Sequence, residues 1–238
     1  MRALGLTAQL SLAFAPPSVR REDFVVSPAN REAVAAVEAW PAWPGGALAL
    51  VGPPGSGKSH LAALWAERAV AQARPAATLD RLDGDAKDGA APAGPVLVEG
   101  ADDAPAAEAL FHLLNRAASG QASVLLTART APRLWRTAVP DLRSRLNALA
   151  VAELGEPDDA ALEALLSVFF RQRRIRPSPE LLGWLVRRIE RSARGAETAA
   201  ARLDEAALAA GRPVSRALAR EVFGDGPHAD DSPELPFG

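Results

Sequence analysis

One stretch of the sequence has residue types and a spacing that suit the binding of phosphate. Residues 52–59 match the pattern G-x-x-x-x-G-K-[ST] at every fixed position. Its glycines allow a tight turn in which backbone N–H groups point at phosphate oxygens. Its lysine adds a charge near the β- and γ-phosphates, and its serine can ligate Mg²⁺. We therefore expect a nucleotide to contact the loop and the next residue, namely Gly52, Pro53, Pro54, Gly55, Ser56, Gly57, Lys58, Ser59 and His60.

The residues on either side are of the kind that position such a loop. Residues 46–51 are apolar, as in a buried strand of a parallel sheet, and apolar residues recur at helical spacing over residues 61–69. A strand, a loop and a helix in this order aim the positive end of the helix dipole at the bound anion. The alternative is a connecting loop that is merely rich in glycine and proline.

A second apolar run, residues 95–98, ends at an acid, Glu99. In nucleotide hydrolases such a strand delivers one acid to Mg²⁺ and usually a second acid that polarises the attacking water. Here the second position is Gly100, which has no side chain. We prefer the register in which Glu99 and the loop serine serve Mg²⁺, and this register predicts poor hydrolysis. Asp102 and Asp103 are the alternative acids if the strand is longer.

The composition excludes several classes of protein. The 238 residues are 48% hydrophobic and 24% charged, as is ordinary for a globular protein. A net charge of −2 gives no overall basic field for nucleic acid. There is no cysteine, which excludes disulfides and thiolate metal sites and favours a reducing, cytoplasmic compartment. The three histidines lie far apart and imply no metal site, and no apolar run is long enough for a membrane span.

Hydrophobic patterns and turn signals divide the chain into four parts. Five apolar runs, at residues 46–51, 76–82, 95–98, 123–127 and 148–154, predict the strands of an α/β P-loop core with a parallel sheet flanked by helices. Ser27 and Pro28 predict the start of a helix that ends near residue 40. Helical patterns at about 158–174, 178–191, 195–210 and 215–223 predict a small all-α lid domain. The predicted parts are an N-terminal tail (1–20), the core (21–154), the lid (155–223) and an acidic tail (224–238).

The N-terminal tail contains a short motif, Gln9-Leu10-Ser11-Leu12-Ala13-Phe14. It resembles the hexapeptide with which bacterial proteins dock on the replication sliding clamp. That resemblance implies that Leu12 and Phe14 fill an apolar pocket, that Leu10 adds contact and that Gln9 fixes the register. A secretory signal and an apolar terminus without function are the alternatives.

The complete pattern resembles one family. An α/β core with a P-loop, a helical lid, the sequence Ser144-Arg145-Leu146 and the segment 23–30 are similar to the AAA+ module of the bacterial initiator DnaA. With the clamp motif added, residues 9–223 resemble more closely the regulators of that family, which are called Hda or HdaA. The resemblance implies that Arg145 is an arginine finger that acts on a neighbour's nucleotide. Two arginines, Arg143 and Arg145, lie in this helical stretch, and a solvated helix face is the alternative for both.

The resemblance also assigns the rest of the nucleotide site. The adenine side is expected to be lined by Phe24, Val25, Val26 and Asn30. Arg194 falls where the sensor arginine of the lid reaches the nucleotide, although residues 195–197 depart from the family's usual ones. Thr127 and Arg129, at the end of a strand, are candidates to sense the γ-phosphate, and a plain strand end is equally compatible.

These expectations combine into one function with several rivals. The resemblance implies a negative regulator of replication initiation that binds ADP or ATP with Mg²⁺, docks on the DNA-loaded clamp and stimulates ATP hydrolysis by DnaA. Residues after 223 are too few for the initiator's DNA-binding domain, so we expect no direct sequence-specific DNA binding and no membrane contact. The resident nucleotide and a homodimer are left open. The rivals are a free-standing AAA+ ATPase, a DnaA-like initiator paralogue and a small-molecule kinase.

Overall fold

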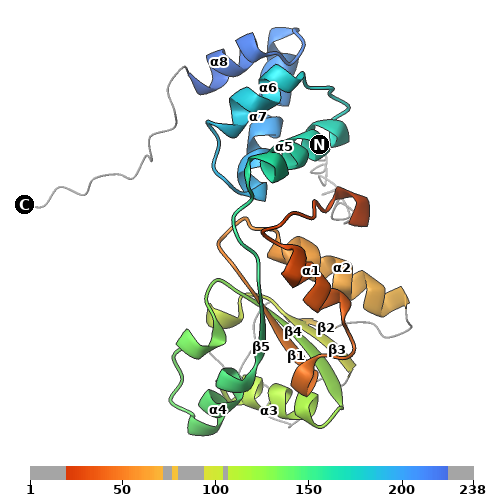
Figure 1. The fold of residues 1–238 in the computed structure, drawn as a ribbon, viewed down its shortest axis with the longest axis vertical. Coiled ribbons are helices and arrows are strands. Elements are labelled where there is room, and N and C mark those ends of the chain that lie inside the picture. Colours follow the sequence, from red (N-terminus) through yellow and green to blue (C-terminus); the bar gives the residue numbers. More distant parts are fainter. Residues whose placement is uncertain (1–19, 72–76, 80–93, 104–106, 225–238) are drawn as a thin grey trace, which may run out of the picture.

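Five strands form one parallel sheet at the centre of the core (Figure 1). The computed structural model describes residues 20–71, 77–79, 94–103 and 107–224. The strand order is β2-β3-β4-β1-β5, so that β1 lies between β4 and β5. The strands are β1 (Ala47–Val51), β2 (Ala77–Leu79), β3 (Gly94–Val98), β4 (Ala122–Ala128) and β5 (Ala150–Glu153). The predicted fold class, a parallel sheet flanked by helices, is confirmed.

Side chains alternate between the two faces of the sheet, as the pleat of a strand requires. On β1, Leu48 and Leu50 pack on one face, whereas Ala47, Ala49 and Val51 pack on the other. Both sets are buried, because helices cover both faces. This double burial explains why the strands are continuous apolar runs in the sequence.

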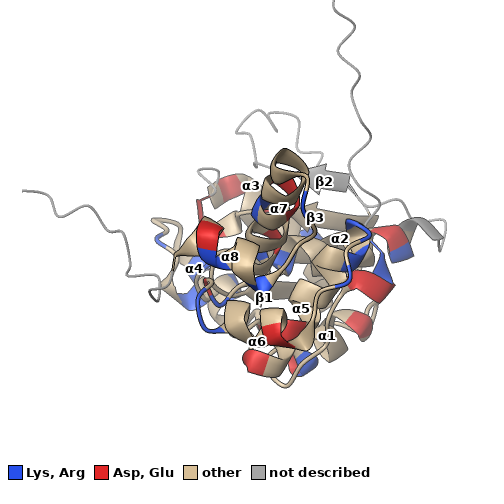
Figure 2. Cartoon of the chain, turned by 90° about the horizontal axis from the view of Figure 1, so that it is seen from above, with Lys and Arg blue, Asp and Glu red and all other residues tan. Residues whose placement is uncertain are grey.

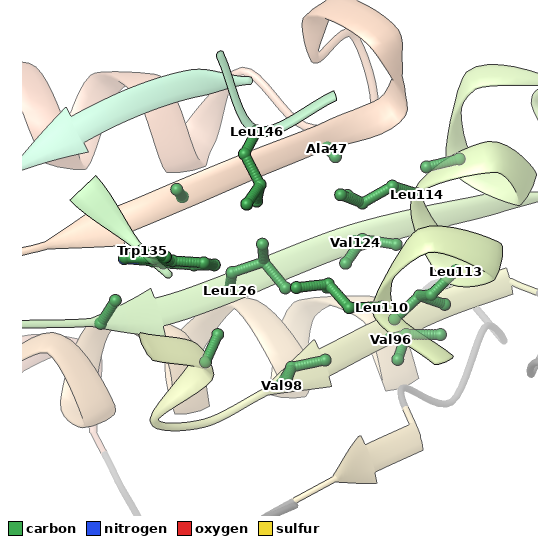
Figure 3. Close-up of a cluster of buried hydrophobic side chains, with 14 of the residues drawn as sticks. Ala47, Val96, Val98, Leu110, Leu113, Leu114, Val124, Leu126, Trp135 and Leu146 are labelled. Atoms are coloured by element: carbon green, nitrogen blue, oxygen red, sulfur yellow. The ribbon is translucent and has the colours of Figure 1, made fainter. Parts of the chain in front are cut away.

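The helices α3 (Ala107–Ala118) and α4 (Pro140–Ala148) cover the face that carries Val51. Figure 3 shows how Leu110 and Leu114 of α3 lie against Val124 and Leu126 of β4. The opposite face is covered by α1 (Arg31–Glu38) and α2 (Lys58–Ala71). Three tryptophans fill that layer, with ring centroids 5.9 Å apart for Trp40 and Trp65 and 5.4 Å apart for Trp43 and Trp65.

The last four helices of the described chain surround a separate apolar cluster. They are α5 (Asp159–Gln172), α6 (Pro179–Val186), α7 (Ala193–Ala210) and α8 (Arg216–Phe223), and we refer to them together as the helical bundle. The cluster is centred on buried side chains such as Leu166, Phe170, Trp184 and Leu203. Because these residues pack on one another and not on the sheet, the bundle has its own core. Figure 1 shows it above the carboxyl end of the sheet.

Each helix of the bundle begins with a side-chain cap. Asp158, Ser178, Ser192 and Ser215 each accept a hydrogen bond from the backbone N–H three residues later. Such caps satisfy N–H groups that have no partner within the helix. They fix the four starting points, and the start of α7 is the one that matters for the site described below.

Two predicted helix limits differ from the structure. The first helix begins at Arg31 and not at Ser27–Pro28, because residues 28–30 form a turn in which the side-chain oxygen of Asn30 accepts from the N–H of Ser27 at 2.8 Å. The helix α6 ends at Val186, about a turn earlier than expected. No helix within the described part of the chain is long and apolar enough to cross a membrane.

The position of Leu126 in the central layer leads to a prediction about stability. Replacing Leu126, which is fully buried, by alanine leaves a cavity in a closely packed layer and should lower the free energy of unfolding by about 2–5 kcal/mol. Leu134 is a matched control, because it is 65% exposed and its replacement by alanine should change that free energy by less than about 0.5 kcal/mol. Urea unfolding followed by circular dichroism measures both values, and equal effects would contradict the packing described here.

Candidate nucleotide site

The loop of residues 52–57 connects the end of β1 to the start of α2 at the carboxyl edge of the sheet. Its first residue is held by a hydrogen bond from the Gly52 N–H to the Ala128 carbonyl at 3.2 Å. Only glycine fits there, because a Cβ on residue 52 would lie 2.4 Å from the Leu154 carbonyl oxygen. Gly55 has φ +73°, and a Cβ there would lie 3.0 Å from the Cβ of Arg194. The loop is therefore enclosed by two segments that follow it by about 100 and 140 residues in the sequence.

Lys58, the first residue of α2, is folded onto the loop. Its Nζ donates hydrogen bonds to the carbonyl oxygens of Gly52 and Pro53, both at 2.7 Å, and to Ser56 Oγ at 3.3 Å. Burial lowers the pKa of Lys58, an effect that the negative charge of Asp102 opposes and the positive charge of Arg129 reinforces. The amine is thus an ordered donor at the start of α2, and the charges of Asp102 and Arg129 act on it.

A cavity of about 1010 Å³ extends from the loop to the helical bundle. Its lining includes residues 55–60 of the loop and α2. It also includes apolar side chains, namely Phe24 and Val25 from the core and Leu165 and Phe169 from α5. Backbone N–H groups suit phosphates and apolar side chains suit a base, so the size and chemistry of the lining fit a nucleotide.

The N-terminal segment of the core forms one wall of this cavity. Asn30 donates from its amide to the Val25 carbonyl at 2.9 Å, which fixes the turn that carries the wall. The Phe24 ring meets the His60 ring edge-on, with centroids 5.3 Å apart. Phe24, Val25, Asn30 and His60 all line the cavity, whereas Val26 does not and is 44% exposed.

The other predicted residues divide between the cavity and the surface. Ser59 and Arg194 line the cavity, and Arg194 comes from the first turn of α7. Pro53 and Pro54 are exposed on the outer side of the loop. Arg145 is exposed on α4, away from the cavity lining. The motif that contains Gln9, Leu10, Leu12 and Phe14 lies outside the described residues and stays a prediction.

The acids predicted to hold Mg²⁺ all follow the end of β3. The strand β3 stops at Val98, and Glu99 is half-buried in the turn that follows. Thr127 is buried and its hydroxyl accepts from the Gly100 N–H at 3.2 Å. Arg129 is exposed and pairs with Asp103 at 3.3 Å. Glu99, Asp102 and Thr127 are not among the residues that line the cavity in this structure.

Sequence patterns did not predict the contacts that join the core to α5 and α7 beside the cavity. Asp23 uses both carboxylate oxygens to hold the end of α5, one to Arg171 Nη2 and one to Gln172 Nε2, both at 3.0 Å. The Ala193 N–H donates to the Gly55 carbonyl at 2.9 Å, which joins α7 to the phosphate loop. Asp23 belonged to the segment that carried the family resemblance, but no local pattern indicates a partner almost 150 residues away.

The residues fit a nucleotide with its Mg²⁺. The glycine backbone and Lys58 are suited to phosphates, and the Ser59 hydroxyl lies on the cavity wall beside them. One buried carboxylate oxygen, Oδ1 of Asp102, has no hydrogen-bond partner and could face a cation. Among the described residues no group of three or more His, Asp or Glu side chains could hold a metal alone. A divalent cation would therefore need phosphate oxygens as well.

Comparisons with solved structures agree on the fold. Domain III of the replication initiation protein DnaA from Thermotoga maritima superposes with a TM-score of 0.74 at 18% identity, over 88% of this chain and 97% of that one. AMPPCP-bound DnaA from Aquifex aeolicus gives 0.63 at 17% identity, over 78% of this chain and 64% of that one. The Thermotoga maritima RuvB branch migration motor gives 0.58 at 15% identity, over 74% and 60%.

The protein therefore has the AAA+ fold that DnaA and RuvB share. It spans just under two thirds of the AMPPCP-bound DnaA chain. Comparison of the sequence with models of protein families gives no match, and comparison with curated protein sequences gives none either.

The contact of Asp23 with α5 leads to a prediction about nucleotide affinity. The carboxylate of Asp23 is only 13% exposed, and Asp23→Ala should loosen the wall between the core and the bundle. If this contact contributes about 1 kcal/mol, the Kd for ADP should rise roughly fivefold. Isothermal titration calorimetry measures the change.

Glu38→Ala is the matched control for this experiment. It removes the same charge, but Glu38 does not line the cavity and its ion pair with Arg21 is well exposed. We expect the Kd of this variant to stay within about twofold of wild type. Equal losses in the two variants would mean that net charge, and not the contact with α5, sets the affinity.

Proposed function

We propose that this protein binds an adenine nucleotide in the cavity and regulates the initiator DnaA, as the Hda group of regulators does. In this proposal it is a negative regulator of replication initiation that acts in the cytoplasm. The observation that carries the proposal is the placement of Arg145. This arginine lies outside the cavity of its own chain, so it can act on a nucleotide only in another molecule.

The nucleotide proposed for the cavity is ADP or ATP with Mg²⁺. The apolar side chains in the cavity lining, among them Phe24 and Phe169, are suited to a base, and the phosphate loop with Lys58 is suited to the phosphates. DnaA structures of the same fold were determined with AMPPCP bound. Mg²⁺, when bound, would neutralise charge on the phosphates, and Ser59 and a nearby acid would hold it.

The structure around Arg145 is suited to an arginine finger. Leu142 and Leu146 fix α4 to the sheet from the buried side of the helix. Arg143 ties the same helix to the preceding loop, because its guanidinium donates to the Arg133 carbonyl at 3.0 Å and to the Trp135 carbonyl. Arg145 is exposed on this base, and no hydrogen bond or ion pair joins its side chain to another described residue. Figure 2 shows the blue segments of Lys and Arg around α4. A free guanidinium on a fixed helix can stabilise phosphoryl-transfer charge in a partner.

The residue after Glu99 favours a regulator over a motor, because it predicts slow hydrolysis in the protein's own cavity. A second acid directly after Glu99 would be needed to polarise the attacking water, and that position is Gly100, with φ +62°. Gly100 has no side chain that could act as a base, and its backbone N–H donates to the Thr127 hydroxyl. The bound nucleotide would then set how the core and the bundle are placed. A free-standing ATPase, the main alternative, would instead turn over ATP rapidly when isolated.

The remaining step brings the protein to its partner. In the proposal, residues 9–14 dock on the sliding clamp that is loaded on DNA, and α4 then presents Arg145 to the ATP held by DnaA. DnaA supplies ATP, Mg²⁺ and water, and this chain supplies one cation. Hydrolysis would leave DnaA in its ADP form and end initiation.

The role of Arg145 is tested by hydrolysis of DnaA-bound ATP in the presence of clamp-loaded DNA. Arg145→Ala should lose nearly all stimulation, because an arginine finger contributes roughly 10³–10⁵ in rate in well-studied cases. Arg136→Ala is the control, since Arg136 is also exposed in the region before α4 and its removal changes the charge equally. Stimulation by Arg145→Ala at the wild-type rate would contradict the assigned role.

Clamp docking is tested separately by retention on immobilised clamp. The double variant Leu12→Ala, Phe14→Ala removes two apolar anchors and should weaken binding by roughly a hundredfold or more. The double variant Leu4→Ala, Leu6→Ala removes comparable apolar groups from the same tail but leaves the motif intact, and it should bind as wild type does. Unchanged retention of the first variant would favour a generic ATPase.

A further inference from the structure

A short turn after β3 carries an aspartate with one carboxylate oxygen that has no hydrogen-bond partner. The turn is a 3-10 helix, η3 (Ala101–Asp103), and Ala101 anchors it in the core. Two contacts attach it to the end of β4, namely the Gly100 N–H to Thr127 Oγ1 at 3.2 Å and the Arg129 N–H to Asp102 Oδ2 at 2.8 Å. The second carboxylate oxygen of Asp102, Oδ1, is buried and has no hydrogen-bond partner.

The two cationic side chains that act on this region, Lys58 and Arg129, bind acceptors other than Asp102. Asp102 accepts from the Arg129 N–H, and the preceding residue, Ala128, accepts from the Gly52 N–H, so this acid lies near the start of the phosphate loop. Its negative charge partly offsets the lowering of the Lys58 pKa by burial. However, the Lys58 ammonium has three N–H donors and gives them to Gly52, Pro53 and Ser56. The Arg129 guanidinium pairs with Asp103 at 3.3 Å. The free oxygen of Asp102 therefore has negative charge next to the phosphate site and no protein cation bonded to it.

A buried, unpaired carboxylate oxygen is costly unless a cation or donor completes it. Mg²⁺ in nucleotide sites is held by one or two carboxylates, phosphate oxygens and several waters. Glu99 is a poorer candidate, because it follows β3 directly in a half-exposed turn and no hydrogen bond to a described residue orients it. The backbone contact of Oδ2, by contrast, fixes the Asp102 carboxylate in one orientation.

We propose that Asp102, and not the strand-end acid Glu99, is the residue that holds the Mg²⁺ of the bound nucleotide, directly or through one of its waters. The inference rests on the proposed nucleotide binding of the cavity. It transfers the metal role from the end of β3 to the turn η3, three residues further along the chain. Ser59 Oγ and the phosphates would supply the other ligands.

The test measures the affinity of the full-length protein for ADP by calorimetry, with Mg²⁺ and with EDTA. Wild type should bind ADP more tightly with Mg²⁺. Asp102→Asn keeps an oxygen that can accept from the Arg129 N–H, yet it removes the charge, so it should lose the Mg²⁺ effect by about tenfold or more. The affinity in EDTA should not fall, because the variant removes a negative charge near the phosphates. Glu99→Gln, which removes one carboxylate from the neighbouring turn, should retain the Mg²⁺ effect.

A change of metal preference provides a second readout that does not depend on Asp102→Asn folding well. The chain has no cysteine, so Asp102→Cys introduces its only thiol. A thiolate is a soft ligand that prefers Cd²⁺ to Mg²⁺. In this variant Cd²⁺ should restore the tight binding of ADP that Mg²⁺ no longer supports. Glu99→Cys and wild type should show no such gain with Cd²⁺.

The outcomes separate this inference from the proposed function. If wild type binds no ADP with or without Mg²⁺, the proposed function and the inference both fail. If wild type binds ADP equally well in Mg²⁺ and in EDTA, or if Glu99→Gln loses the Mg²⁺ effect while Asp102→Asn keeps it, only the inference is overturned. A Cd²⁺ gain in Glu99→Cys but not in Asp102→Cys would also overturn it.

Discussion

The close approach of two distant segments to the phosphate loop is the constraint on which the site depends. The Leu154 carbonyl lies against Gly52 and leaves no room for a side chain there, and the start of α7 lies against Gly55, where a Cβ would be a tight contact. A backbone hydrogen bond from Ala193 to Gly55 joins the loop to α7 directly. The conformation of the loop and the position of the bundle are therefore coupled, and a ligand that orders one also biases the other.

This coupling explains how a modest number of contacts can position the bundle. The apolar clusters of the sheet and of the bundle are separate, so little buried apolar area joins the two parts. They meet instead through polar contacts, chiefly Asp23 with α5, Ala193 with the loop and the Gly155 N–H with the Ala29 carbonyl at 3.0 Å. The lining of the cavity includes Phe24 from the core and Phe169 from the bundle, so a bound nucleotide would add contacts to both parts and would have a large effect on their placement.

Sequence patterns predicted what depends on local or periodic signals. The strands follow from apolar runs, because burial on both faces of a parallel sheet leaves no polar positions, and the loop follows from glycine spacing. The start of α1 was missed because the Asn30 side chain replaces a helical turn with a local hydrogen bond. The contacts of Asp23 and Asp102 were missed for a different reason. Each depends on which groups meet in three dimensions, and no spacing in the sequence records that.

Two neighbouring pairs show why residue type alone could not assign the roles. On α4, Arg143 and Arg145 are two residues apart, and only their partners distinguish them, since Arg143 donates to two carbonyls whereas no hydrogen bond joins Arg145 to a residue that the structure describes. In η3, Asp103 neutralises the Arg129 guanidinium, and this pairing leaves the adjacent Asp102 oxygen without a cation. In both cases one residue uses its charge to fix the local structure, so its neighbour keeps a charge that is available to a ligand or a partner.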